Sequence, residues 1–119
     1  MRARITKAFH FDAAHFLPHV PEGHKCRRMH GHTYRVVLGL EGELDPRLGW
    51  VQDYGELKAA FAPLLRRFDH QVLNEISGLE NPTAELLAVY IFEALKPALP
   101  LLADVAVCES PSAEACYRP

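Results

Sequence analysis

The chain is organised around the stretch Cys26-Arg27-Arg28-Met29-His30-Gly31-His32. Side chains on an extended strand alternate between its two faces, so His30 and His32 point the same way. Gly31 leaves the position between them without a side chain. Two imidazoles that converge on one point suit a zinc ion. The thiol of Cys26 lies close enough in the sequence to share the same pocket.

The distribution of histidines favours a metal site over a pair of solvent-facing imidazoles beside a turn. Six of the seven histidines lie within the first 32 residues, and His15 offers a third imidazole. Three imidazoles with an open fourth position are typical of catalytic zinc, whereas a fourth protein ligand closes a structural site. Cys26 is therefore a reactive thiolate beside the metal, a fourth zinc ligand, or an inert apolar residue.

Length and composition indicate a single soluble domain over residues 1–119. Hydrophobic residues make up 49% of the chain and charged residues 24%, which is an ordinary globular balance. The net charge of −2 argues against a nucleic-acid or anionic-membrane binder, because both need a broad basic face. Three cysteines form no paired framework, and we see neither a signal peptide nor a bilayer-spanning apolar run. We expect a cytoplasmic protein with reduced thiols.

Strands are predicted in the first part of the chain and helices in the middle. Residues 3–16 and 30–44 have strand patterns, and the prolines and Gly23 between them indicate a loop over 17–29. Asp53 followed by Glu56 is a capping-box signature, and the helix that it begins contains Pro63, which should kink or weaken it.

The second half of the chain predicts another helix and two more strands. Asn81 is the expected N-cap of this helix, with Pro82 at its first position and Pro97 at its end. Strands follow over residues 102–109 and 114–118. The order β-β-α-α-β-β predicts an α+β fold with an antiparallel sheet and both helices on one face. Four strands leave two open edges, and a homo-oligomer would close them.

These motifs together resemble the 6-pyruvoyltetrahydropterin synthase family, and within it the bacterial branch that forms 6-carboxytetrahydropterin for queuosine biosynthesis. Each motif is weak alone, but the set extends almost from end to end of the chain. It comprises Phe11-Asp12-Ala13-Ala14-His15, Leu17-Pro18, Glu22-Gly23-His24-Lys25-Cys26, His30-Gly31-His32, Asp69-His70, Leu73-Asn74, Asn81-Pro82-Thr83 and Glu109. Only three residues separate Cys26 from His30, and this short spacing favours the carboxy-forming branch.

The resemblance implies the tunnelling fold, in which β-β-α-α-β-β subunits close a barrel as trimers and two trimers stack into a homohexamer. It implies a pterin triphosphate substrate, 7,8-dihydroneopterin triphosphate. The implied products are 6-carboxy-5,6,7,8-tetrahydropterin, acetaldehyde and triphosphate. Zn²⁺ would be held by His15, His30 and His32.

The resemblance also implies roles for residues outside the metal site. Cys26 would be the general base, with its thiolate favoured by the cationic side chains nearby. Asp69 and His70 resemble a proton-relay pair; because adjacent side chains do not easily bond each other, we expect this pair to act across a subunit boundary. The candidate triphosphate contacts follow from their charge alone and not from the resemblance: His19, His24, Lys25, Arg27 and Arg28.

Glu109 is the expected anchor for the pterin ring. A carboxylate in an apolar strand is costly unless it has a partner, and a pterin offers two adjacent N–H groups that a carboxylate can accept. The alternative is that the strand ends at Val107 and Glu109 is merely exposed. Thr83 would help to hold the pterin or cap the second helix.

Three functions remain open at this point. The first is the zinc-dependent carbon–carbon lyase described above. The second is the pyruvoyl-forming reaction, which eliminates triphosphate without loss of carbon. The third is a non-catalytic structural zinc module in which Cys26 completes the coordination.

Overall fold

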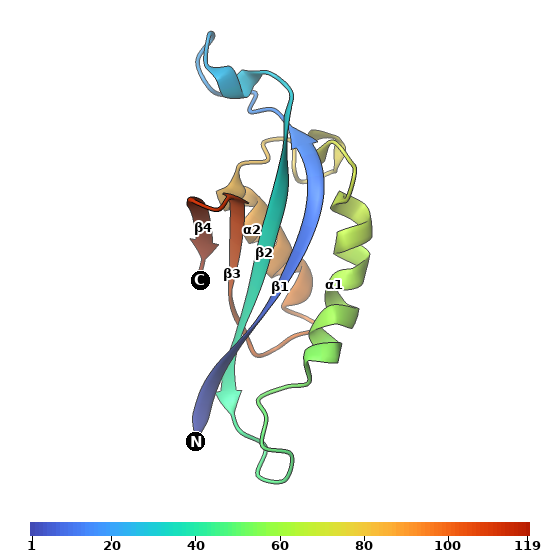
Figure 1. The fold of residues 1–119 in the computed structure, drawn as a ribbon, viewed down its shortest axis with the longest axis vertical. Coiled ribbons are helices and arrows are strands. Elements are labelled where there is room, and N and C mark those ends of the chain that lie inside the picture. The colour runs from blue at the N-terminus through green and yellow to red at the C-terminus, as the bar shows by residue number, and fades with distance from the viewer.

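The computed structural model describes all residues, 1–119, and the elements follow the order β-β-α-α-β-β (Figure 1). The strands are β1 (Arg2–His15), β2 (His30–Glu43), β3 (Leu102–Ser110) and β4 (Ala113–Tyr117). The helices are α1 (Tyr54–Phe68) and α2 (Ala84–Leu95), and neither is long and apolar enough to cross a membrane. Short 3₁₀ turns occupy Lys25–Arg27 and Leu73–Glu75.

The four strands form one antiparallel sheet in the order β1-β2-β3-β4. β1 and β2 have 14 residues each, whereas β3 has 9 and β4 has 5, so the first hairpin extends beyond the rest of the sheet. The molecule is accordingly elongated, with extents of 57 × 23 × 23 Å. Residues 16–29 connect β1 and β2 at one end of the molecule, where His15 pairs with His30.

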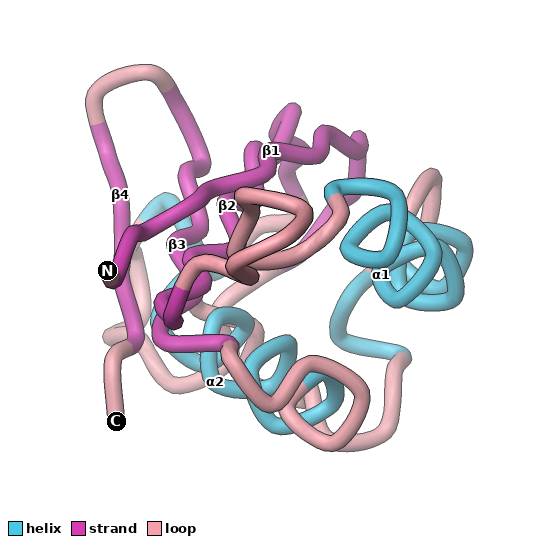
Figure 2. The backbone as a smooth tube through the Cα atoms, turned by 90° about the horizontal axis from the view of Figure 1, so that it is seen from below, coloured by secondary structure: helices cyan, strands magenta, loops and turns pink.

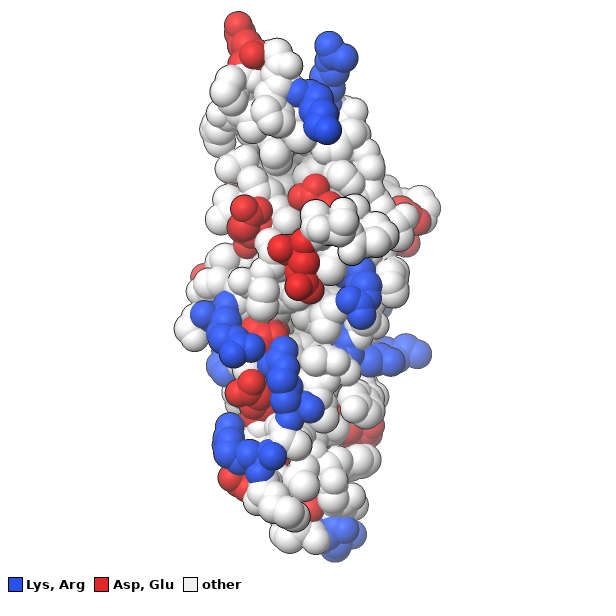
Figure 3. All heavy atoms as spheres, turned by 60° about the vertical axis from the view of Figure 1, so that its left-hand side comes forward, with Lys and Arg blue, Asp and Glu red and all other residues white.

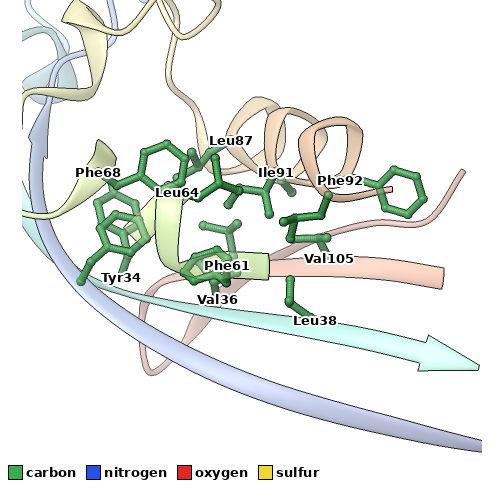
Figure 4. Packing of buried hydrophobic residues seen from close by; sticks show 14 of the residues in the cluster. Tyr34, Val36, Leu38, Phe61, Leu64, Phe68, Leu87, Ile91, Phe92 and Val105 are labelled. Carbon is green, nitrogen blue, oxygen red and sulfur yellow. The ribbon is translucent and has the colours of Figure 1, made fainter. Parts of the chain in front are cut away.

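One face of the sheet carries the hydrophobic core. Both helices lie against this face (Figure 2), which confirms the predicted layers. The strand pattern predicted over residues 30–44 is also confirmed, because alternate side chains of β2 face the core and are fully buried: Tyr34, Val36, Leu38 and Leu40. They pack against Phe61, Leu64 and Phe68 of α1 and against Leu87, Ile91 and Phe92 of α2 (Figure 4).

The opposite face of the sheet is polar and contains an ion pair in which the carboxylate is buried and the guanidinium is partly exposed. Arg4 of β1 donates to both carboxylate oxygens of Asp104 on β3, at 2.6 and 2.7 Å. Arg118 adds a further contact to Asp104 at 3.0 Å. Gly39 of β2 lies beneath this bridge, and a Cβ at Gly39 would collide with the Asp104 carboxylate and the Arg4 guanidinium. Glycine is therefore required where the bridge crosses the middle strand.

The helix starts agree with the sequence in one case and differ in the other. Asp53 caps α1 as predicted, since its side chain accepts a hydrogen bond from Gly55 N. The prediction that Asn81 caps α2 is wrong: Thr83 is the N-cap, and its hydroxyl accepts from Leu86 N at 3.1 Å. Pro82 thus precedes the helix instead of beginning it.

Candidate metal centre

Three imidazoles meet where the first hairpin leaves the helical layer. His15 ends β1 and pairs with His30 at the start of β2, while His32 faces the same side two residues later. The ring centroid of His15 lies 4.5 Å from that of His30 and 5.1 Å from that of His32. One ligand nitrogen from each residue lies within 4.8 Å of the others. The structure therefore brings together the three predicted metal ligands.

His15 is fixed by the chain segment that precedes α2. Its Nδ1 lies 2.7 Å from the carbonyl oxygen of Pro82, and a carbonyl only accepts, so Nδ1 carries the proton and donates. Nε2 is then the nitrogen with a free lone pair, but it is buried and has no hydrogen-bond partner. Burial lowers the pKa of His15, which keeps the imidazole neutral, as a metal ligand must be.

Each of the other two imidazoles shares one of these features. His30 Nδ1 donates to the Arg28 carbonyl oxygen at 2.7 Å, which leaves Nε2 for a ligand. His32 Nε2 is buried without a hydrogen bond, although the Glu109 carboxylate lies 3.2 Å away. Backbone carbonyls that hold Nδ1–H groups are typical of metal-binding histidines. A divalent metal would satisfy the buried nitrogens, so the donor set fits zinc.

Glu109 lies beside the imidazoles. β3 continues to Ser110, so the alternative in which the strand ends at Val107 is wrong. The side chain of Glu109 is 29% exposed and reaches His32 as described above. A hollow of about 350 Å³ opens next to it, lined also by Ala84 and Glu85 at the start of α2. The carboxylate thus faces both the metal centre and a space that a small ring could occupy.

Tyr34 forms the floor of the centre, a place that the sequence pattern assigns only to the core. Its ring contacts His15 and His32 edge-on, with centroids 5.9 and 5.4 Å apart. The hydroxyl is buried and has no hydrogen-bond partner. Burial, followed by the negative charge of Glu109, raises the pKa of Tyr34, so its hydroxyl stays protonated. The signal in the sequence that could have shown this role is that Tyr34 follows His32 by two residues, so both side chains lie on the same face of the strand.

Cys26 lies in the connection between β1 and β2, outside the imidazole cluster. Its backbone is fixed on both sides: the carbonyl accepts from Leu17 N at 2.8 Å, and the N–H donates to His24 Nδ1 at 3.1 Å. The thiol is half-buried and unpaired. The group of mutually close ligand atoms contains three imidazoles and no sulfur. This geometry argues against Cys26 as a fourth ligand.

Asp69 and His70 lie at the end of α1, on the outer edge of β1. The expectation that these neighbours cannot bond each other is wrong, because His70 Nδ1 lies 3.1 Å from Asp69 Oδ2. His70 has a positive φ of 59°, which turns its ring back toward Asp69. The N–H of Asp12 and then His70 lower the pKa of Asp69. No hydrogen bond or ion pair joins this pair to the imidazole cluster within one chain.

The candidate triphosphate contacts lie in the exposed loop between β1 and β2; Figure 3 shows Lys and Arg side chains at one end of the molecule and also along the rest of this face. Arg27 donates to the Val20 carbonyl at 2.8 Å, and the ring of His24 caps the short turn. Lys25, Arg28 and His19 are exposed. The hydroxyl of Thr83 is already engaged as the cap of α2. Among the Lys and Arg residues of this loop, Lys25 and Arg28 are therefore the ones whose side chains are exposed and free to bind an anion.

Comparison with known proteins agrees with this geometry. Residues 4–119 match the family described as 6-pyruvoyl tetrahydropterin synthase. The chain is 42% identical to the 6-carboxy-5,6,7,8-tetrahydropterin synthase of Synechocystis, over 95% of this chain and 91% of the relative. It is 35% identical to the dihydroneopterin monophosphate aldolase of Pyrococcus furiosus, over 84% of this chain and 81% of the relative.

A solved structure extends the likeness to the fold. The 6-pyruvoyl tetrahydropterin synthase of Caenorhabditis elegans superposes with a TM-score of 0.92 at 28% identity, covering 100% of this chain and 96% of that one. The order of elements, the sheet and the placement of both helices are therefore those of the tunnelling fold.

Proposed function

This chain belongs to the 6-pyruvoyl tetrahydropterin synthase family, and we propose that it is a zinc-dependent lyase of the carboxy-forming branch. It would convert 7,8-dihydroneopterin triphosphate and one water to 6-carboxy-5,6,7,8-tetrahydropterin, acetaldehyde and triphosphate, as a step of queuosine biosynthesis. The observation that carries the proposal is the cluster of three imidazoles, in which the Nε2 atoms of His15 and His32 are buried without a hydrogen-bond partner. The similarity to the Synechocystis synthase and the short spacing between Cys26 and His30 favour the carboxy product.

His15, His30 and His32 would hold the zinc ion. Zinc bound there would supply a Lewis acid that lowers the pKa of a coordinated hydroxyl and stabilises negative charge near it. The carbonyls of Pro82 and Arg28 keep two of the rings oriented through their Nδ1–H groups. Tyr34 is fully buried beside these rings and would keep water away from that side of the metal.

Glu109 would anchor the pterin. Its carboxylate borders the hollow at the start of α2 and can accept two adjacent N–H groups of a pterin ring. Thr83, as the cap of α2, would shape that hollow and contact the ring through its non-hydroxyl atoms. The ring would then lie between the imidazoles and the start of the helix.

Proton transfer would be divided between two groups. Cys26, outside the imidazole cluster, would act as the general base. Asp69 and His70 would relay protons, with Asp69 holding the His70 ring through the 3.1 Å contact. Because this pair has no contact with the imidazoles of its own chain, it would serve the centre of a neighbouring subunit in a homohexamer.

The triphosphate would meet the exposed basic loop. Lys25, Arg27 and Arg28 are free of ion pairs, and His24 lies beside them. Among these, Arg27 is partly engaged by the Val20 carbonyl, so Lys25 and Arg28 would make the main contacts. The protein would act in the cytoplasm on this small-molecule substrate, without nucleic-acid or membrane partners.

Product analysis tests this function. Zinc-loaded protein incubated with 7,8-dihydroneopterin triphosphate should yield 6-carboxytetrahydropterin and acetaldehyde in equal amounts by mass spectrometry. The His30→Ala variant, treated in the same way, should give neither. A 6-pyruvoyl product without acetaldehyde would place the chain in the pyruvoyl-forming branch, and an aldol cleavage product would align it with the Pyrococcus relative. Stoichiometric zinc without any turnover would favour the structural module.

A further inference from the structure

The segment that follows α1 pairs with the free edge of β1 close to the metal centre. Asp12 N donates to Asp69 Oδ1 at 3.0 Å, and His70 N donates to the Asp12 carbonyl at 2.6 Å. Ala14 N donates to the Gln71 carbonyl at 3.0 Å, and Ala14 also forms a parallel bridge with Val72. Residues 69–72 thus occupy the place that another strand would take beside β1.

Asn74 continues this pairing with its side chain in place of a backbone. Phe16 N donates to Asn74 Oδ1 at 3.0 Å, and Asn74 Nδ2 donates to the Phe16 carbonyl at 2.8 Å. A longer contact of 3.4 Å joins Asn74 Nδ2 to the Glu80 carbonyl. The orientation of the amide is fixed, because an N–H can only donate and a carbonyl can only accept. One amide therefore imitates a strand residue across 58 positions of sequence.

His15 lies immediately before the residue that Asn74 holds. The Pro82 carbonyl holds the ring of His15, and Asn74 holds the backbone of the next residue, Phe16. Residues 74 and 82 therefore restrain His15 at two points, one at its ring and one at its backbone. Pairing between β1 and β2 ends with His15 and His30, and Leu17 N then bonds to the Cys26 carbonyl at 2.8 Å. Phe16 is the residue whose backbone would otherwise face solvent on the open edge.

We propose that Asn74 is a positioning residue for the metal ligand His15. This inference rests on the proposed function, in that it takes the three histidines to hold a metal. Removal of the amide would release the end of β1 from the 73–83 segment and let the His15 ring move relative to Pro82. Partners that orient a metal ligand typically contribute about 10- to 100-fold in metal affinity.

Zinc affinity measured by competition with a chromophoric chelator tests the proposal. Asn74→Ala should bind zinc about 10- to 100-fold more weakly than the wild type. Gln71→Ala is the matched control, since Gln71 is an exposed amide in the same segment that pairs with β1 only through its backbone, and its affinity should be unchanged. Asn74→Asp keeps the acceptor for Phe16 N and loses the donor, so it should fall between the two.

The absorption spectrum of bound Co²⁺ separates positioning from a general effect on the fold, because it reports the geometry of the ligands. If Asn74 acts through His15, Asn74→Ala should alter this spectrum as well as weaken metal binding, whereas Gln71→Ala should alter neither. Wild-type affinity in folded Asn74→Ala, or weaker binding with an unchanged Co²⁺ spectrum, would overturn the inference. Should Asn74→Ala not fold, wild-type affinity in Asn74→Asp would overturn it. Failure of the wild type itself to bind zinc would instead refute the proposed function.

Discussion

Cys26 and His30 are near neighbours in the sequence, yet they have different surroundings. His30 has one ring nitrogen engaged by the Arg28 carbonyl and the other turned toward two imidazoles. Cys26 is fixed through its backbone only, and its thiol lies outside that group. Removal of His30 and removal of Cys26 should therefore have different effects on the protein.

Substitution of each side chain by alanine should separate metal binding from proton transfer. His30→Ala should lose both zinc and turnover, because two imidazoles remain where three are needed. Cys26→Ala should retain zinc and fold but lose about 10²- to 10⁴-fold in rate, the usual contribution of a positioned proton-transfer group. Metal analysis and single-turnover kinetics on both variants would measure this. Full activity in Cys26→Ala would remove the thiol from the mechanism.

The metal ligands could be predicted from the sequence, but what holds them could not. Strand alternation places His30 and His32 on one face, and the cluster of histidines draws attention to His15. The contact between His15 and the Pro82 carbonyl spans 67 residues and involves a backbone atom that no residue type announces. The unpartnered hydroxyl of Tyr34 is likewise a product of tertiary packing.

At the scale of elements, the bridge between Arg4 and Asp104 joins β1 to β3 across Gly39 of β2. Asp104 is 2% exposed, and the hydrogen bonds from Arg4 are the main cause that lowers its pKa below the usual 3.8. A carboxylate with a lowered pKa in the folded state stabilises the fold above its unfolded pKa, and that contribution is lost as pH falls below it.

Replacement of Arg4 should show how much its bridge to Asp104 contributes to the stability of the fold. Arg4→Met leaves the buried Asp104 with Arg118 alone and should lower the free energy of unfolding by about 1–3 kcal/mol at neutral pH. The difference from the wild type should shrink as pH falls below 3.8, where the unfolded carboxyl binds a proton. Arg2→Met, on the same strand and without an ion pair, is the control. Denaturation at fixed protein concentration measures both, and a pH-independent difference would contradict the assignment.

The order of elements followed from the sequence because hydrophobic periodicity and turn residues are local signals. The start of α2 did not, since Asn81, Pro82 and Thr83 include two good capping residues beside a proline. In the structure, Thr83 N donates to the Asn81 carbonyl at 2.9 Å, which makes a tight turn about Pro82 and directs its carbonyl to His15. The turn that delays the start of α2 therefore also orients the Pro82 carbonyl toward the metal ligand His15.

At the scale of the whole molecule, the sheet retains open edges. Residues 69–74 cover the outer edge of β1 only from Asp12 to Phe16, so the outer edges of the first part of β1 and of β4 remain open. Unpaired edges of this kind favour association with further copies. The separation of Asp69 and His70 from the imidazoles within one chain is consistent with a site completed by a second subunit.

Sedimentation should reveal this assembly. At micromolar concentration we expect a homohexamer and no stable species at the chain mass of 13.4 kDa. Mixing an inactive Cys26→Ala variant with an inactive His70→Ala variant should restore part of the activity if subunits share sites. A stable monomer with full turnover would contradict the shared site.

X-ray absorption at the zinc edge would show whether three imidazoles hold the metal and leave its fourth position open. In the loaded wild type we predict nitrogen and oxygen ligands at about 2.0–2.1 Å, three of them imidazoles, with no sulfur contribution. The Cys26→Ala spectrum should be the same. A sulfur ligand at about 2.3 Å that disappears in Cys26→Ala would contradict the account and identify a closed structural site.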